Sequence, residues 1–362
     1  MTRIAVLTSH LTTGDAVSND VLRMCDALER RGYEARPYAG GQDFQVPKVW
    51  PASGLKDFLV DAEDILIYHY SIGWEPGLEL LRELKCRTVI KYHNVTPPEF
   101  FEGISQWHID KCRDGRSQLR EIVRHGCDLY LADSEYNRRE LLDEGAEKGR
   151  SFVVPPFHHI DRLQDIAADL QMLDRFRDGK TNVLMVGRVA PNKGHPELIE
   201  AFAAYHHDYN RDSRLIIVGK EEEAFLTYST RLREMIAFFL LEKSVEFIGE
   251  VSDAALKACY LLSNAFMFTS KHEGFCVPLV EAMAMKVPIV AYASSAIPDT
   301  VGNAGLVLEQ RDPRLMAGAV NTLIEDETIA VALGLNGWRR FKRRYTNRKI
   351  EKEFLRALAV LG

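Results

Sequence analysis

The sequence predicts an α/β protein with two Rossmann-like domains that face each other across a cleft. Short apolar runs alternate with helical patterns along the chain, which is typical of parallel sheets. This alternation restarts after Pro155 and Pro156, so one architecture occurs twice. At 362 residues, the chain is long enough for about two domains.

The first half contains the strands and helices of one such domain. We expect strands at Arg3–Thr8, Glu34–Tyr38, Asp64–His69, Thr88–Tyr92, Asp128–Ala132 and Ser151–Val154. We expect helices near Ser18–Arg31, Pro76–Leu84, Ser105–His125 and Ser134–Leu142. Residues 161–180 are polar with helical spacing, and we interpret them as the connection between the domains.

The second half repeats the pattern. We expect strands at Val183–Val186, Arg214–Val218, Val245–Ile248, Ala265–Phe268 and Val287–Ala291. We expect helices at Pro196–Tyr205, Thr227–Leu240 and Ser252–Leu262, and a short helix that begins near Pro278. The predicted domains are therefore an N-terminal domain over 1–168 and a C-terminal domain over 169–344.

Composition excludes several classes of protein. Hydrophobic residues make up 46% of the chain and charged residues 27%, as in soluble globular proteins. The net charge of -6 argues against a nucleic-acid partner. The N-terminus runs directly into a strand without a signal peptide, and no apolar stretch approaches the ~18 residues of a membrane span. Six scattered cysteines without a CxxC pair indicate reduced thiols and a cytoplasmic location.

The most informative motif is a pair of glutamates, Glu273 and Glu281, separated by seven residues. The motif follows an apolar strand and spans a glycine turn and the start of a helix. The amides of Gly274, Phe275 and Cys276 would then point out of a helix N-terminus, where anions bind well. Two carboxylates beside a diphosphate need another role, such as accepting hydrogen bonds from hydroxyls. A ligand with a central diphosphate and a polyol at each end fits, which describes a sugar nucleotide.

A second motif places two cations, Arg188 and Lys193, on the loop from Gly187 to Gly194. An arginine can fork across two phosphate oxygens, and a lysine acts as a point charge. Two solvated loop cations are the alternative. The two-glutamate motif downstream favours diphosphate binding.

Other candidates also follow predicted strands, where ligands of open α/β sheets bind. His93 follows one strand; it is either a site residue or a structural histidine, and His69 has a similar placement. Gly14 lies in a polar loop without a GxGxxG fingerprint. We find no metal motif, so cations and a helix N-terminus would have to meet the diphosphate charge.

Two segments combine aromatic and basic residues. Phe100, Phe101 and Trp107 precede a basic helix, which fits either an interfacial element or a lid with a charged outer face. The run from Trp338 to Tyr345 is strongly basic. It fits either contact with anionic lipid or a solvated helix face whose aromatic residues pack inward.

Taken together, these motifs resemble the retaining glycosyltransferases of family four, which have the GT-B fold. The resemblance rests on Gly187-Arg188 with Lys193-Gly194, on Phe247–Val251 and on Glu273–Met283. It is specific over residues 183–305 and looser before residue 150. It implies a donor bound mainly by the C-terminal domain, an acceptor bound mainly by the N-terminal domain, and a last helix within 345–362 that packs back on the first domain.

The resemblance also implies individual roles. Arg188 and Lys193 would hold the diphosphate, Glu281 the ribose and Glu273 the donor sugar, and the amides of Phe275 and Cys276 would complete the site. His93 matches the family's histidine that approaches the donor sugar, and Gly14 matches a glycine of its first loop. Three positions depart from the usual pattern: Asp15 for a glycine, Cys276 for a glycine, and Asp299 for a glutamate.

We therefore expect a metal-independent, retaining hexosyltransferase with no cofactor. Its donor would be a GDP- or UDP-linked, mannose-like or glucose-like sugar, and its acceptor a saccharide in polysaccharide or glycolipid assembly. A lipid-linked acceptor and peripheral contact with the inner membrane face stay open. Glu273 would act as stabiliser or, less favoured, as nucleophile. The alternatives are an epimerase or other GT-B enzyme, and a non-catalytic sugar-nucleotide-binding protein.

Overall fold

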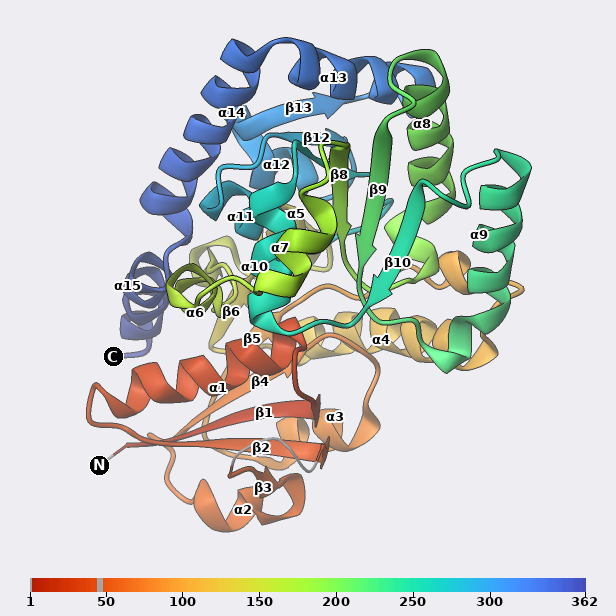
Figure 1. Cartoon of the computed structure of the whole chain (residues 1–362). Helices are drawn as coiled ribbons and strands as arrows, with labels where there is room; N and C mark the ends of the chain where they lie inside the picture. Colours follow the sequence, from red (N-terminus) through yellow and green to blue (C-terminus); the bar gives the residue numbers. More distant parts are fainter. Residues whose placement is uncertain (1, 44–47) are drawn as a thin grey trace. The chain divides into compact units, whose positions relative to one another are not determined.

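The computed structural model describes residues 2–43 and 48–362 and contains two compact units (Figure 1). The first unit comprises Met1–Glu99, Trp107–His159 and Thr346–Gly362, and the second comprises Phe100–Gln106 and Ile160–Tyr345. The main boundary thus lies nine residues before the one expected from the sequence, between His159 and Ile160 instead of 168 and 169. The short segment 100–106 belongs to the second unit, which no sequence pattern indicated.

The first unit is built on a seven-stranded parallel sheet. Its strands are β1 (Arg3–Leu11), β2 (Glu34–Gln42), β3 (Trp50–Pro51), β4 (Ile65–Tyr70), β5 (Arg87–Tyr92), β6 (Leu129–Ala132) and β7 (Ser151–Val153). Its helices are α1 (Ala16–Glu29), α2 (Leu55–Phe58), α3 (Glu75–Glu83), α4 (Gln106–His125), α5 (Glu135–Asp143) and α15 (Asn347–Leu358). The strand order is β3-β2-β1-β4-β5-β6-β7, so the order reverses between β1 and β4.

The second unit is built on a six-stranded parallel sheet. Its strands are β8 (Thr181–Val186), β9 (Ser213–Val218), β10 (Val245–Gly249), β11 (Ala265–Phe268), β12 (Ile289–Tyr292) and β13 (Gly305–Leu308). Its helices are α6 (Ile160–Asp165), α7 (Leu170–Phe176), α8 (His195–Asp208), α9 (Leu226–Phe238), α10 (Asp253–Leu262), α11 (Val277–Ala284), α12 (Ile297–Val301), α13 (Pro313–Glu325) and α14 (Glu327–Arg340). The strand order is β10-β9-β8-β11-β12-β13, which reverses between β8 and β11.

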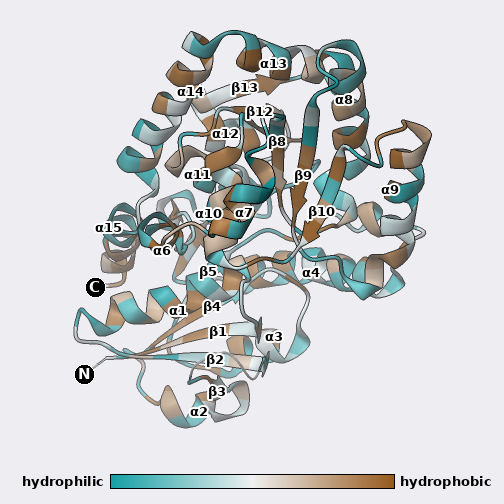
Figure 2. Cartoon of the chain, viewed as in Figure 1, coloured by the Kyte–Doolittle hydropathy of each residue, from teal (hydrophilic) through white to brown (hydrophobic). Residues whose placement is uncertain are grey.

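Most of the inner strands form because their residues are apolar and buried on both faces of the sheet. Every residue of β4, β6, β9, β11 and β12 is buried. Such continuous burial is typical of parallel sheets whose faces are both covered by helices. Figure 2 shows the apolar residues concentrated on the strands, whereas the helices also carry hydrophilic residues. These two sheets confirm the predicted α/β class.

The stretch expected as a polar connection, 161–180, contains two short helices that belong to the second unit, α6 and α7. Leu163 and Phe176 are buried, and the amide of Asp169 donates to the carbonyl of Ala254, 3.0 Å away. Its polar residues mostly face outward, which is why the sequence suggested a linker.

The last helix, α15, belongs to the first unit. Its apolar side contributes Ile350, Phe354, Ala357 and Leu358 to the hydrophobic core of that unit. The rings of Phe354 and Phe157 meet edge to face, with 6.2 Å between their centroids. The two ends of the chain are therefore joined in one core by burial of apolar surface.

Candidate functional site

The switch point of the second sheet brings the two sequence motifs together. The loop that carries Arg188 and Lys193 follows β8, and the loop that carries Glu273 follows β11, its neighbour in the sheet. In open α/β sheets, ligands bind outside the carboxyl ends of the strands at the point where the strand order reverses. Both motifs therefore lie where a ligand is expected.

Direct hydrogen bonds join these two loops. The carbonyl of Asn192 accepts from the amide of Lys271 at 2.8 Å, and the hydroxyl of Thr269 donates to the carbonyl of Gly194 at 2.7 Å. Gly194 has a φ of 70°, and a Cβ at this position would lie 2.1 Å from the carbonyl oxygen of Thr269. Only glycine allows the two backbones to approach this closely.

Lys193 and Glu273 form an ion pair between the loops. The Lys193 ammonium lies 2.7 Å from the Glu273 carboxylate, and the two side chains are 17% and 7% exposed. The Glu273 amide donates to the hydroxyl of Ser295 at 2.7 Å. The structure thus places two predicted site residues in contact, with Glu273 held at its carboxylate by Lys193 and at its backbone amide by Ser295.

Arg188, the other predicted phosphate ligand, is paired with Glu222. Its guanidinium lies 2.7 Å from the Glu222 carboxylate, and its side chain is 62% exposed. Sequence analysis missed Glu222. The signal that could have found it is the acidic run at 221–223, just after the carboxyl end of β9 and the neighbouring Gly219-Lys220. An anion that binds Arg188 must compete with this carboxylate.

The residues just before α11, the helix of the two-glutamate motif, have unpaired amides. Among the described residues, the backbone N–H groups of Phe275 and Cys276 meet no hydrogen-bond acceptor. They precede the first residue of α11, where the helix dipole favours an anion. The Phe275 carbonyl is fixed by the hydroxyl of Thr300 at 2.8 Å, which orients this loop.

Cys276 departs from the usual glycine but keeps the conformation that a glycine would adopt. Its φ is 74°, in the left-handed region. A non-glycine residue pays roughly 1–2 kcal/mol for this conformation. Its side chain is buried, and burial raises the pKa of the Cys276 thiol well above its ordinary value. The thiol therefore stays protonated, in keeping with a space-filling side chain.

Glu281 is buried on α11 and already has one partner. The hydroxyl of Tyr260 donates to its carboxylate at 2.7 Å. Burial, together with the Glu281 charge, raises the pKa of Tyr260 well above its ordinary value, so this hydroxyl remains a donor. Tyr260 is a further residue that sequence analysis missed, because nothing in the chain links helix α10 to the motif.

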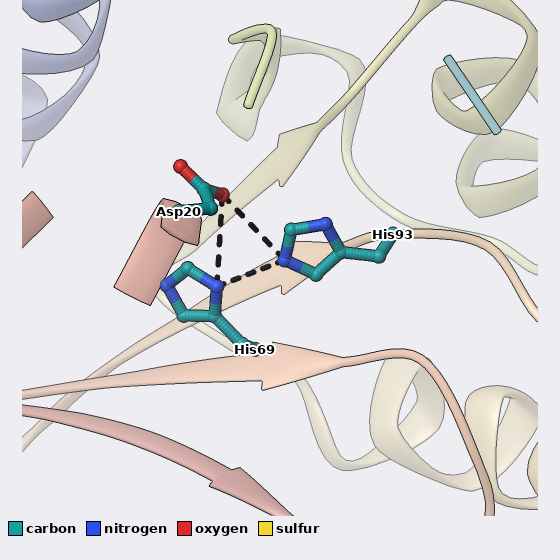
Figure 3. Close-up of side chains that lie close together, drawn as sticks. All are labelled: Asp20, His69 and His93. Carbon is teal, nitrogen blue, oxygen red and sulfur yellow. Dashed lines mark hydrogen bonds and ion pairs between the residues drawn. The ribbon is translucent and has the colours of Figure 1, made fainter. Parts of the chain in front are cut away.

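The first unit holds a separate group of buried polar residues around His93. The Nδ1 atom of His93 lies 2.8 Å from the Asp133 carboxylate. Its Nε2 atom lies 2.8 Å from Nδ1 of His69, as Figure 3 shows. One Asp20 oxygen is 3.5 Å from His93 Nε2 and 3.6 Å from His69 Nδ1. The fully buried Lys91 ammonium pairs with Asp133 and lies 3.7 Å from Asp20.

The charges in this His93 network perturb one another. Burial raises the pKa of Asp20, although Lys91 and His93 oppose this effect. Burial alone would also raise the pKa of Asp133, but the charges of His93 and Lys91 outweigh it and lower that pKa. Burial lowers the pKa of His69 well below its ordinary value, so His69 is neutral at pH 7.

Asp20, His69 and His93 offer ligand atoms that lie within 4.8 Å of one another, the spacing of a metal site. The Lys91 ammonium, however, already supplies a cation beside Asp20 and Asp133. The facing imidazole nitrogens share a hydrogen bond, which needs a proton between them. The group is therefore better described as a hydrogen-bonded ionic network than as a metal centre.

The predicted site residues thus lie in two groups, one in each unit. The second unit holds Arg188, Lys193, Glu273, Phe275, Cys276 and Glu281. The first unit holds Gly14 and His93, which follow β1 and β5. Gly14, with a φ of 81°, precedes Asp15, whose side chain caps α1 by accepting from the Ser18 amide. Asp15, where the family usually has a glycine, therefore has a structural role.

The aromatic segment does not form one exposed tip. Phe101 is buried and stacks on Phe225 with 5.8 Å between ring centroids, and Phe100 lies 6.1 Å from the ring of His272. Trp107, by contrast, is 58% exposed. In the basic run near the C-terminus, Phe341 and Tyr345 are buried, and the Arg340 guanidinium donates to the Thr300 carbonyl at 2.9 Å.

Known proteins resemble this chain in sequence. Residues 174–340 match the model of the glycosyl transferases group 1. The D-inositol 3-phosphate glycosyltransferase of Corynebacterium glutamicum is 31% identical over 343 residues, which cover 87% of this chain and 78% of that protein. The mannosylfructose-phosphate synthase of Agrobacterium fabrum is 30% identical over 289 residues, which cover 73% of this chain and 63% of that protein. The chain therefore belongs to the group 1 family, the family-four glycosyltransferases.

Solved structures agree on the fold. A sucrose-phosphate synthase from Thermosynechococcus elongatus has a TM-score of 0.79 at 18% identity. The alignment covers 100% of this chain and 99% of that protein's chain. The Anabaena protein HepE in complex with UDP and glucose has a TM-score of 0.79 at 17% identity. That alignment covers 99% of this chain and 100% of the HepE chain. Both support the predicted GT-B fold. Over the described residues, none of the helices has both the length and the apolar character needed to cross a membrane.

Proposed function

We propose that this chain transfers a hexose, with retention of configuration, from a GDP- or UDP-linked sugar to a saccharide acceptor. The observation that carries the proposal is the contact between Lys193 and Glu273 at the switch point of the second sheet. Beside it lie the unpaired amides of Phe275 and Cys276. A cation, anion-binding amides and a carboxylate at one place match the diphosphate and hydroxyls of a sugar nucleotide.

Each part of the site has a role in this proposal. Lys193 and Arg188 bind the diphosphate, and the N-terminus of α11 adds dipole and amide contacts. Glu281 accepts from the ribose hydroxyls, with Tyr260 orienting its carboxylate. Glu273 accepts from hydroxyls of the donor sugar. Relatives support the donor class, because a Mycobacterium tuberculosis protein that is 29% identical over 61% of this chain is described as a GDP-mannose-dependent mannosyltransferase.

The proposed reaction is a front-face displacement. The acceptor hydroxyl oxygen forms a bond to the anomeric carbon while the bond from that carbon to the diphosphate oxygen breaks. The hydroxyl proton passes to the departing diphosphate, so the products are a glycoside and the nucleoside diphosphate. Arg188, Lys193 and the α11 dipole stabilise the charge that grows on the leaving group. These groups supply that stabilisation without a metal ion.

Two measurements test the proposal. Calorimetric titration with GDP and UDP in the presence of EDTA should show binding of at least one of them. Loss of binding in EDTA that Mg²⁺ restores would contradict the metal-independent assignment. NMR of the product should show the same anomeric configuration as in the donor. Conversion of the donor to another sugar nucleotide without acceptor would identify an epimerase, and tight donor binding without hydrolysis or transfer would identify a binding protein.

A further inference from the structure

The first unit contains a concave site that neither sequence motif lines. It is a groove of about 920 Å³ between α1 and α15. Arg23, Arg30 and Arg31 line it from α1 and the turn that follows. Arg348, Lys349, Lys352 and Arg356 line it from α15. We refer to it below as the α1/α15 groove.

The groove is strongly basic in a chain that is acidic overall. Seven cationic side chains face two carboxylates, Asp26 and Glu351, which leaves the groove with a net charge of +5. The whole chain carries a net charge of -6. A local excess of one sign in a concave surface focuses the potential and attracts ions of the opposite sign.

Most of these cations are not neutralised by the protein. Glu351 accepts from Arg30 at 2.8 Å and lies 3.7 Å from Arg31. Among the described residues, no ion pair is made by the remaining five, which are Arg23, Arg348, Lys349, Lys352 and Arg356. Their charges are therefore available to a ligand.

The basic residues at the start of α15 do not stabilise the helix. Arg348 and Lys349 lie in its first turn, which contains no acidic residue, and cations at a helix N-terminus oppose the helix dipole. The helix is held instead by its apolar side, which includes Ile350 and Phe354 in the core of the first unit. A need for solubility would be met equally well by mixed charges.

We propose that the α1/α15 groove binds a ligand with clustered phosphate groups, separate from the donor site of the second unit. Five of the seven cations are arginines, whose guanidinium groups fork across phosphate oxygens. Asp26 and Glu351 can accept hydrogen bonds from ligand hydroxyls, and Phe157 and Leu355 provide apolar walls. The groove volume lies within the roughly 300–1,000 Å³ of small-molecule sites. The inference does not depend on the proposed function.

The test uses tripolyphosphate as the free probe and vesicles of phosphatidylglycerol in phosphatidylcholine as the membrane probe. The variant R348Q/K352Q/R356Q removes three groove cations from the exposed side of α15. The control R231Q/K243Q/R314Q removes three exposed cations of the second unit, none of which lines the α1/α15 groove. Both triple variants change the net charge equally, and circular dichroism should show native helix content for both.

We expect tripolyphosphate to bind by calorimetry at physiological salt, and the dissociation constant to rise by about tenfold or more in the groove variant, which corresponds to a loss of about 1.4 kcal/mol. Binding should persist in the control and in Lys193→Gln, which separates this site from the donor site. Vesicle association that is lost in the groove variant and kept in the control, while tripolyphosphate does not bind, would assign the phosphates to lipid headgroups. Absence of binding to both probes, or equal binding by the groove variant and the control, would overturn the proposal.

Discussion

The Lys193 ammonium and the Glu273 carboxylate lie 2.7 Å apart although 80 residues separate them in the chain. The contact joins the loop after β8 to the loop after β11, and it is largely shielded from solvent. A donor diphosphate that binds Lys193 would leave Glu273 facing the adjacent sugar. In the proposed function Glu281, deeper in α11, binds the ribose, and this division of roles can be tested.

Glu281→Ala should mainly weaken nucleotide affinity, and Glu273→Ala should mainly lower turnover. A hydrogen bond between a hydroxyl and a carboxylate is worth about 1.5–3 kcal/mol, or roughly 10- to 150-fold in affinity. Calorimetry with GDP or UDP and initial transfer rates would measure the two effects. If Glu273→Ala abolishes nucleotide binding while Glu281→Ala retains it, the two assignments are reversed.

Glu222→Gln should strengthen donor binding by a few-fold at most. The substitution frees the Arg188 guanidinium from its 2.7 Å contact, and exposed ion pairs are worth about 0–1 kcal/mol. Glu223→Gln is the matched control, because its exposed side chain does not pair with Arg188 in the described structure. Isothermal titration calorimetry of both variants with the nucleotide would measure the change in affinity. Weaker binding by Glu222→Gln would show that this carboxylate itself contacts the donor.

Lys91→Met should destabilise the first unit by about 3–5 kcal/mol. It removes the fully buried ammonium that pairs with Asp133 and lies 3.7 Å from Asp20. Two buried carboxylates then lose the lysine that offsets their charge. Urea denaturation would measure the loss. The double variant Lys91→Met/Asp133→Asn should recover part of it, because only one of the two carboxylates then remains. A loss in the double variant equal to the sum of the losses in Lys91→Met and Asp133→Asn would show that the ions do not interact energetically.

Stability should fall as the pH is lowered below about 6.5, partly because of His195. Burial lowers the pKa of His195 from 6.5 to about 3. Between these values the unfolded chain binds a proton that the folded chain does not, so unfolding becomes more favourable by up to about 1.4 kcal/mol per pH unit. His195→Phe should flatten this dependence in urea titrations at pH 7, 6 and 5. An unchanged slope would contradict the burial of a neutral imidazole.

Much of the second unit could be predicted from the sequence because its signals are local. The strand before Glu273, the glycine turn and the helix that contains Glu281 all appear as one continuous pattern. Contacts between distant residues could not be predicted in this way. Nothing local pairs Arg188 with Glu222, and nothing in the chain indicates that His69, Asp20 and Lys91 meet around His93. Such contacts depend on strand order, which the sequence pattern leaves open.

The segment around Phe101 shows the same limit. Its aromatic residues look equally exposed in the sequence, yet Phe101 is buried against Phe225 and Trp107 is 58% exposed. Phe101→Ala should therefore cost about 3–5 kcal/mol of stability, as for other buried phenylalanines. Trp107→Ser should leave the melting temperature unchanged. The two residues separate a packing role from a surface role within one short segment.

We further propose that Trp107 serves the acceptor side. Trp107→Ser should retain nucleotide binding, because Arg188 and Lys193, the proposed phosphate ligands, lie in the other unit. Its transfer rate should fall with a lipid-linked or saccharide acceptor, and co-sedimentation with anionic vesicles should fall only if the tryptophan inserts into the interface. Leu226→Ser, which replaces another exposed apolar residue in the second unit, is the control. Transfer and vesicle binding equal to those of the unmodified protein would identify Trp107 as ordinary surface.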